Sequence, residues 1–463
     1  MSSTKAAPPT FDSGGLRGHQ PRIALTAVGG YFVDGYDLLI LSGALLAITP
    51  EFGLNSIQLG ALTAAAFLGM ALGSATTGPL TDRFGRRVIF FSSMALFVLG
   101  SALFLFAQQP WQLIALRFVI GLAIGADMPA AASLIAEFIP ARRRGTFTAL
   151  GGVAWMLGAL VAIGVVIGIF SLFGTGAWRW AMATGAVGAV VLMILRHGTP
   201  ESPHWLRTQG REEEARAAWR YATGSAEEPP STPVTPAATR TPASIRRLFR
   251  RPLLPLLVCM CVYWGVNNLY GSAITLYQPT LIKRIVDPGT FTALIFTACT
   301  SALAVVIGLV VCLVLIERIG RRALAVAGTS IVVVAMVVIW AGFHHAAVVL
   351  VAFGAVLGFI NGGTSMAYYA WAPELFPTAV RGRAVGVVNM VGKLGSVVGT
   401  FALPTVFAAW GSGAFLLIGA IALVNVVCTA LLSIETKGRS LDDIQLVAHQ
   451  RYGGAAPVDQ VRQ

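Results

Sequence analysis

The stretch Gly78-Pro-Leu-Thr-Asp82-Arg-Phe-Gly85-Arg-Arg87 has a counterpart in Glu317-Arg-Ile-Gly-Arg-Arg322, 235 positions later (317 minus 82). A second motif repeats at nearly the same offset. Glu137-x-x-Pro140-x-x-x-Arg144-Gly145 matches Glu374-x-x-Pro377-x-x-x-Arg381-Gly382, 237 positions later (374 minus 137). Two different motifs at nearly one offset indicate that the chain consists of two related halves.

Most of the chain around these motifs is apolar. Hydrophobic residues make up 56% of the 463 positions, charged residues only 11%, and the mean hydropathy is +0.74. Because soluble domains are about 25% charged, this chain has too few polar residues to cover a water-exposed surface. Stretches long enough to cross a hydrocarbon core, about 20 residues each, are predicted at 23–48, 56–79, 88–107, 112–137, 146–170, 178–196, 253–282, 291–316, 323–343, 346–372, 384–408 and 413–434.

These spans are expected to be helices, since open strands cannot satisfy their backbone in lipid. The predicted fold is an all-α membrane protein with twelve transmembrane helices in two pseudo-symmetric six-helix bundles. Because each half has six spans, the halves are parallel repeats, which commonly hold a site between them at the membrane midplane. The predicted parts are a cytoplasmic tail (1–22), the N-terminal bundle (23–196), a cytoplasmic connector (197–252), the C-terminal bundle (253–434) and a second cytoplasmic tail (435–463).

Basic residues gather on one side of the predicted membrane. Of 33 lysines and arginines, three (Arg179, Lys283 and Arg284) fall in external loops and two (Arg117 and Lys393) inside spans, which leaves 28 on the cytoplasmic side. This distribution follows the positive-inside rule. The net charge of +13 therefore indicates membrane orientation and not nucleic-acid binding. The five cysteines lack metal-ligand spacing, and no metal site is predicted.

Together the motifs resemble those of the major facilitator superfamily of transporters, over residues 23–445. The 78–87 stretch is similar to the superfamily's loop between spans two and three, and Arg117-Phe-Val-Ile-Gly121-Leu-Ala-Ile-Gly125 to its span-four motif. Pro200-Glu-Ser-Pro-His-Trp-Leu206, Pro373-Glu-Leu-Phe-Pro377 and Glu435-Thr-Lys-Gly-Arg-Ser-Leu441 resemble signatures of the sugar-porter branch. The resemblance implies the major facilitator fold and secondary transport by alternating access. It leaves the substrate open, because these motifs belong to the cytoplasmic gate.

The repeated charged motifs are interpreted as this gate. Asp82 is expected to meet the positive N-terminal end of a neighbouring helix. Pairs between the two halves are expected among Glu137, Arg144, Glu374 and Arg381, and the resemblance implies that they latch the cytoplasmic side in the outward-open state. The alternative is that these charges only orient the chain in the membrane. The full predicted gate set is Asp82, Arg83, Arg86, Glu137, Arg144, Glu317, Arg318, Glu374 and Arg381.

Five ionisable residues fall well inside spans: Asp34, Asp37, Arg117, Asp127 and Lys393. A charge at mid-depth costs about 2.5–3.5 kcal/mol to insert. These side chains are therefore expected to be paired with one another or to line a wet cavity. Each is a candidate functional residue.

Asp34 and Asp37 lie three residues apart and hence on one face of the first span. Two carboxylates so close repel each other when both are ionised. This repulsion favours a proton on one of them, as a proton carrier requires. The sequence around Asp37 resembles span one of proton-coupled sugar porters, where an aspartate pairs with the span-four arginine, here Arg117. Asp37 is therefore the preferred proton site and Arg117 its partner, with a static ion pair as the alternative. Asp127 is either a second proton carrier or a structural acid beside the Pro129 kink.

Lys393 is the most informative residue for the substrate. It lies nine residues into the predicted eleventh span, about 14 Å deep at 1.5 Å per residue, in the half without a deep acid. In the organic-anion carriers that the chain resembles, a basic residue in span eleven is associated with the substrate carboxylate. Asp34-Gly-Tyr-Asp37 is likewise typical of relatives that carry aromatic acids. The alternative is that Lys393 snorkels or pairs with Asp34 or Asp127.

Aromatic and amide side chains complete the predicted cavity: Trp155, Trp264, Asn268, Asn361, Tyr368 and Asn389. An aromatic wall with a few amides and one cation suits a flat or small organic anion. Each aromatic has helix packing as its alternative role. Sugar porters carry paired glutamines where this chain has Asn267-Asn268, which disfavours hexose transport. Asn268 also stands where a phosphate symporter is expected to have an acid.

The sequence thus predicts a proton-coupled symporter of a small organic anion in a bacterial inner membrane, with both termini cytoplasmic. A sugar or polyol porter, a phosphate symporter and a drug-efflux antiporter are the alternatives within transport, and a sensor without turnover is the alternative outside it. Enzyme function is not expected, since no P-loop and no nucleophile elbow occurs. Apart from protons no cofactor is expected, and the protein is expected to act as a monomer in the lipid bilayer.

Overall fold

The computed structural model describes residues 16–224, 248–286, 289–342, 345–377, 380–439 and 441–452, and no strand occurs among them. The first half contains α1 (Gln20–Phe52), α2 (Ser56–Phe84), α3 (Arg86–Leu103), α4 (Pro110–Phe138), α5 (Ala141–Phe173) and α6 (Trp178–Arg196). Two short helices follow, α7 (Pro203–Thr208) and α8 (Glu212–Thr223).

The second half contains α9 (Leu253–Val286), α10 (Thr290–Val310), α11 (Ile316–Ile319), α12 (Arg321–Ala341), α13 (Ala346–Leu357), α14 (Ser365–Leu375), α15 (Arg381–Trp410), α16 (Gly413–Leu432) and α17 (Leu441–Tyr452). Within the described residues, eleven helices are long and apolar enough to cross a membrane. The remaining span is built from α13, a π-helical turn (Gly358–Thr364) and α14, which follow one another without a break. The predicted twelve-span architecture is therefore confirmed, with an irregular tenth span.

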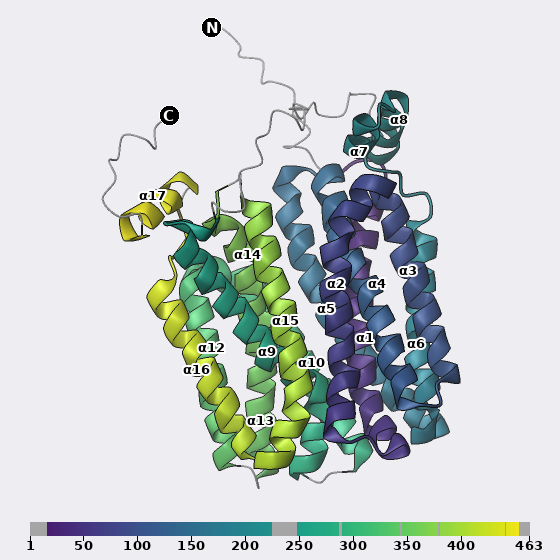
Figure 1. Ribbon diagram of the computed structural model, residues 1–463, viewed down its shortest axis with the longest axis vertical. Helices are drawn as coiled ribbons and strands as arrows, with labels where there is room; N and C mark the ends of the chain where they lie inside the picture. The colour runs from purple at the N-terminus through teal and green to yellow at the C-terminus, as the bar shows by residue number, and fades with distance from the viewer. Residues whose placement is uncertain are drawn as a thin grey trace.

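The two halves stand side by side, and α7, α8 and α17 all lie at one end of the molecule (Figure 1). We call this the connector end and the other the opposite end. Between the halves, α2 packs along α15 and α5 along α10. Because α1 and α9 also meet, the central helices of both halves border the space between them.

α1 is the most deeply embedded span. Gly35 faces the backbone carbonyl of Trp155 on α5, and Gly158 faces that of Phe32 on α1, so closely that a β-carbon at either glycine would overlap the carbonyl. Small residues permit such close helix packing in membranes. The contact fixes the rotation of α1, and with it the direction of its acidic residues.

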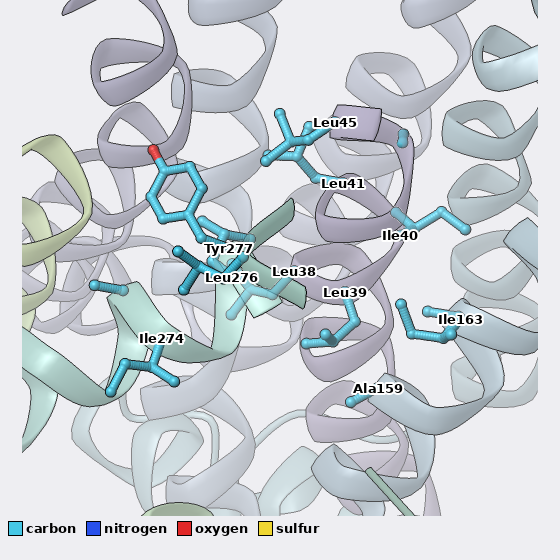
Figure 2. Packing of buried hydrophobic residues seen from close by; sticks show 14 of the residues in the cluster. Leu38, Leu39, Ile40, Leu41, Leu45, Ala159, Ile163, Ile274, Leu276 and Tyr277 are labelled. Atoms are coloured by element: carbon cyan, nitrogen blue, oxygen red, sulfur yellow. The ribbon is translucent and has the colours of Figure 1, made fainter. Parts of the chain in front are cut away.

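An apolar core surrounds α1 on the side of the opposite end. Figure 2 shows α1 side chains between α5 on one side and α9 on the other; the labelled residues are Leu38, Leu39, Ile40, Leu41, Leu45, Ala159, Ile163, Ile274, Leu276 and Tyr277. This apolar packing joins the two halves. The polar residues of α1 therefore lie next to an apolar contact between the N-terminal and C-terminal halves.

Candidate functional site

Asp37 and Arg117 form a buried ion pair between α1 and α4. Arg117 Nη1 donates to Asp37 Oδ2 at 2.7 Å, and the side chains are 3% exposed or less. The expected pairing of these two residues is confirmed. Arg117 Nε and Nη2 have no hydrogen-bond partner within the described part of the chain. A buried guanidinium with unused donors is costly, so this pair retains capacity for another acceptor.

Asp127 takes part in a second buried ion pair, which the sequence did not predict. Arg196 Nη1 and Nη2 donate to its two carboxylate oxygens at 2.6 and 2.9 Å. Ser93 donates to Asp127 at 3.1 Å, and the Arg196 guanidinium lies 3.4 Å from the centre of the Phe90 ring. The structure thus favours the structural role for Asp127, held by Arg196 rather than by the Pro129 kink.

Arg196 ends the sixth span and belongs to the 28 basic residues predicted on the cytoplasmic side. Instead its side chain turns inward and is fully buried. It also donates to the Phe90 carbonyl at 3.0 Å, and Gly30 of α1 packs against the Asp127–Arg196 pair. Four helices, α1, α3, α4 and α6, therefore meet at one charged contact near the connector end.

Asp34 differs from the other two aspartates. Its side chain is 3% exposed, and Oδ1 has no hydrogen-bond partner among the described residues. The charged groups in electrostatic range are Lys393 of α15, Asp37 on its own helix, and Asp127 and Arg117 of α4. Tyr31 of α1 and Tyr369 of α14 also lie near it. Within the part of the chain that the structure describes, Asp34 is thus a buried carboxylate without an ion-pair partner.

Lys393 reaches across the space between the halves. Its Nζ contacts Met70 Sδ of α2 at 3.9 Å. The acid within electrostatic range of this ammonium group is Asp34. Where the structure describes both partners, no salt bridge joins Lys393 to Asp34 or Asp127. The alternative that Lys393 is already neutralised by one of these acids is therefore not supported.

The predicted aromatic wall is present on the C-terminal half. The rings of Trp264 (α9) and Tyr368 (α14) stack in parallel at 3.8 Å. Tyr368 donates to Asn389 Oδ1 at 3.1 Å. Asn268 donates to the Trp264 carbonyl at 2.8 Å and accepts from Ser396 at 3.3 Å. These interactions bring four of the predicted cavity residues together.

Tyr369, which was not among the predicted site residues, is the more solvent-exposed ring of this aromatic wall. It is 42% exposed, whereas Tyr368 is 1% exposed. Its ring meets Trp264 and Tyr368 edge-on at 5.7 and 5.5 Å. Since Tyr31 and Asp34 of the other half lie in its electrostatic range, Tyr369 faces the space between the halves. The buried Tyr368 ring stacks on Trp264 and thereby supports the wall.

A small cavity of about 20 Å³ lies between the halves. It has room for about one water molecule. The lining includes the predicted residue Trp155, and comprises Leu39, Trp155, Met156, Ala159, Thr275, Gln278, Ser301, Ala304 and Leu357. The side chain of Asn361 falls outside the described residues.

Toward the opposite end, hydrogen bonds join the halves directly. The hydroxyl groups of Thr63 (α2) and Tyr277 (α9) lie 2.6 Å apart, and Tyr277 donates to the Thr400 carbonyl of α15 at 3.1 Å. Gly60 of α2 packs against the Phe401 backbone of α15. The space between the halves is therefore closed on this side.

At the connector end, each half has its own charged network. Glu137 pairs with Arg86 and accepts a hydrogen bond from Ser202. In the second half, Glu374 pairs with Arg321 at 3.2 Å and accepts from Thr436 at 2.5 Å. In this structure both acids bind arginines of their own half. The side chain of Arg144 lies outside the described residues, so the expected pairing between halves stays a prediction.

The N-terminus of α3, the helix that follows Asp82 in the chain, is capped by another acid. Glu201 accepts from the backbone N–H groups of Arg86 and Arg87 at 2.9 and 3.1 Å, and so caps α3. Glu435 does the same for α12, accepting from Arg321 and Arg322 at 2.9 and 3.0 Å. Both acids lie in the quoted Pro200–Leu206 and Glu435–Leu441 motifs, but the motifs alone did not reveal this role.

The other predicted gate residues make smaller contacts. Asp82 and Arg83 are exposed; the Asp82 carbonyl accepts from Trp205 at 2.9 Å, and Arg83 stacks on Phe84 at 5.2 Å. The Arg318 carbonyl accepts from Lys437 at 2.5 Å, and Arg381 donates to the Phe376 carbonyl at 3.3 Å. The side chains of Arg144 and Glu317 lie outside the described residues.

We expect Glu201→Gln and Glu435→Gln each to lower the free energy of unfolding by about 1 kcal/mol. Each substitution removes a negative charge from a helix N-terminus while retaining one hydrogen-bond acceptor. Thermal unfolding of the purified protein measures this effect. Asp82→Asn is the control, since that side chain is exposed and lies in the last turn of α2, away from any helix N-terminus of its own. An equal loss in the control would show that the caps contribute nothing specific.

The fold is that of a secondary transporter of the major facilitator type. It superposes on the inward-open conformation of the xylose transporter XylE from Escherichia coli with a TM-score of 0.76, over 92% of this chain and 99% of that one, at 19% sequence identity. The family described as "Sugar (and other) transporter" matches residues 23–448. The chain belongs to this family, as the resemblance of its motifs implied.

Two curated relatives align along nearly the whole chain. The inner membrane metabolite transport protein YgcS of Escherichia coli (strain K12) is 32% identical over 446 residues, covering 94% of both proteins. The niacin transporter NiaP of Acinetobacter baylyi is 28% identical over 429 residues, covering 90% of this chain and 94% of that one. The protein is therefore a membrane-embedded transporter of a small molecule, in a superfamily whose members are generally not enzymes.

Proposed function

We propose that this transporter is a proton-coupled symporter of a small organic anion, such as an aromatic or other carboxylic acid. In this proposal it acts as a monomer in a bacterial inner membrane, with both termini in the cytoplasm. Protons are its coupling ion, and it needs no other cofactor.

Lys393 carries the proposal. An ammonium group deep in a membrane protein needs an anion, yet the contact recorded for Lys393 Nζ is the sulfur of Met70. A substrate carboxylate supplies that anion, and the low local dielectric strengthens the attraction. The edge and face of the exposed Tyr369 ring offer a surface for a flat acid beside this cation.

Proton coupling is supported by the acids on the other side of the same space. Asp37 and Arg117 form an ion pair with unused donors, so protonation of Asp37 and release of Arg117 involve few other contacts. Import of a monovalent anion against a membrane potential costs about 2.3 kcal/mol per 100 mV. Loading at least one proton cancels this cost. The niacin carried by the relative NiaP is an example of the proposed class.

The test is uptake into proteoliposomes under an imposed inward proton gradient, with benzoate, nicotinate, shikimate, phosphate and hexoses as probes. We expect a carboxylate to accumulate, and Lys393→Ala to lower its apparent affinity by about 10–100-fold, the equivalent of a charged hydrogen bond of about 1.5–3 kcal/mol. Lys283→Ala is the control, because Lys283 contacts Thr290 at the opposite end.

Other outcomes assign other functions. Accumulation of a hexose or of phosphate, with Lys393→Ala without effect, makes the protein a sugar porter or a phosphate symporter and Lys393 structural. Binding without counterflow in vesicles makes it a sensor. Each of these results would contradict the proposal.

A further inference from the structure

Three aspartates lie inside the N-terminal half, and two of them have arginine partners. Asp37 is paired with Arg117, and Asp127 is held by both Nη atoms of Arg196. Asp34 has neither an ion pair nor a hydrogen bond to its buried Oδ1 within the described residues. An isolated carboxylate in such surroundings cannot stay ionised without large cost. It must carry a proton or acquire a cation.

The cation that Asp34 can acquire is Lys393. Of the charged groups around Asp34, Arg117 is engaged with Asp37, and the remaining two, Asp37 and Asp127, are acids. The phenols of Tyr31 and Tyr369 are the other titratable groups near it. Lys393 comes from the opposite half, and among the described residues its ammonium contacts the thioether of Met70. Its long side chain can therefore exchange partners without breaking a salt bridge.

We propose that Asp34 is a proton-carrying group in its own right, and that its ionised form displaces the substrate anion from Lys393. This inference rests on the proposed function and names the residue that ejects the substrate. While Asp34 holds a proton, Lys393 is available to the substrate carboxylate, as in the arrangement seen here. When the Asp34 O–H bond breaks, the proton passes to water that enters the space between the halves, and the carboxylate remains. Lys393 then pairs with Asp34, and the substrate leaves.

This exchange couples the two ligands through competition for one ammonium group. A ligand shifts such an equilibrium only by its differential affinity for the two states. Protonation of Asp34 removes the internal competitor and thereby strengthens anion binding, while anion binding to Lys393 strengthens protonation of Asp34 by the same factor. The Asp37–Arg117 pair is a separate element, because Arg117 already neutralises Asp37.

The first arm of the test needs no substrate. Asp34→Lys alone places two cations in the space between the halves, and Lys393→Asp alone places two acids there. Either variant is expected to lower the midpoint of thermal unfolding, and the double reversal to restore most of the loss. The matched control combines Asp37→Lys with Lys393→Asp, where no restoration is expected because the partner of Asp37 is Arg117. A double reversal of Asp34 and Lys393 that is no more stable than the single variants would overturn the pairing.

The second arm measures coupling with radiolabelled benzoate and nicotinate. Each coupled proton contributes about tenfold to accumulation per unit of pH gradient. Asp34→Asn is therefore expected to lose about tenfold in accumulation at a gradient of one unit, while exchange in counterflow continues. The apparent affinity of this variant is expected to stop weakening as pH rises. Accumulation as in the unaltered protein would overturn the coupling role of Asp34.

The two arms separate this inference from the proposed function. If the unaltered protein accumulates no organic acid, the proposed function fails, whatever the charge reversals show. If it accumulates one and the double reversal restores nothing, the symporter stands and the exchange between Asp34 and Lys393 is wrong.

Discussion

Arg117→Ala is expected to destabilise the protein by about 3–5 kcal/mol and to abolish accumulation of substrate. Removing one partner of a buried ion pair leaves the other as an uncompensated charge. Here that charge is Asp37, whose side chain is 3% exposed and whose Oδ2 accepts from Arg117 at 2.7 Å. Thermal unfolding of purified protein and uptake into proteoliposomes measure the two effects.

A control for the stability effect is available on α8. Arg211 pairs with Glu214 at 2.5 Å, but both side chains are about half exposed. Because solvent screens such pairs, Arg211→Ala is expected to leave the stability almost unchanged. A loss of the same size in Arg117→Ala would mean that the buried pair is wet and adds little to stability.

The double variant Asp37→Asn/Arg117→Gln separates stability from transport. Both charges are then gone, and two amides can hydrogen-bond to each other, so most of the stability is expected to return. Accumulation is expected to stay about tenfold lower at a gradient of one pH unit, because position 37 no longer binds or releases a proton while Asp34 still does. If the double variant accumulates substrate as the unaltered protein does, the Asp37–Arg117 pair is a static structural element.

The positions of the spans and the Asp37–Arg117 pair could be predicted from the sequence. Long apolar runs leave a helix as the only stable state in lipid, and the resemblance to proton-coupled porters supplied the partner of Asp37. The partner of Asp127 was not predictable in this way. Arg196 ends the sixth span, where a charged side chain normally reaches the membrane surface, and only the tertiary structure shows that it turns inward.

The gate shows a different limit of sequence reasoning. Because the motifs of the two halves are alike, Glu137 has an arginine of equivalent type in its own half and in the other half. Spacing cannot choose between them, and in this structure the acid binds Arg86 of its own half. A contact between halves at the connector end also depends on the conformational state, which a repeated motif does not specify.

The tenth span shows why the exposed one of Tyr368 and Tyr369 could not be predicted from the sequence. In a regular helix, 3.6 residues per turn set the direction of each side chain. The π-helical turn at Gly358–Thr364 adds a residue per turn and rotates everything after it. Tyr369 rather than Tyr368 is consequently the exposed ring. Such turns occur often at functional sites, and this one directly follows Leu357, which lines the small cavity between the halves.

Arg196→Ala is expected to destabilise the protein as strongly as Arg117→Ala, by about 3–5 kcal/mol. The substitution removes both hydrogen bonds to Asp127 and the contact with the Phe90 carbonyl. Thermal unfolding measures the loss. Arg22→Ala is the matched control, because Arg22 donates to the carbonyls of Leu195 and His197 beside Arg196 but is exposed and holds no carboxylate there.

The double variant Asp127→Asn/Arg196→Gln is expected to differ from the corresponding change at Asp37 and Arg117. Both carboxylate oxygens of Asp127 are bound by Arg196, and Ser93 donates to one of them, so protonation of this acid has to break several charged hydrogen bonds. Stability is therefore expected to return, and accumulation with it, since the cluster carries no coupled proton. A double variant that folds but no longer accumulates substrate would make Asp127 a second coupling residue. Two buried pairs of the same chemistry would then have the same role despite their different hydrogen bonding.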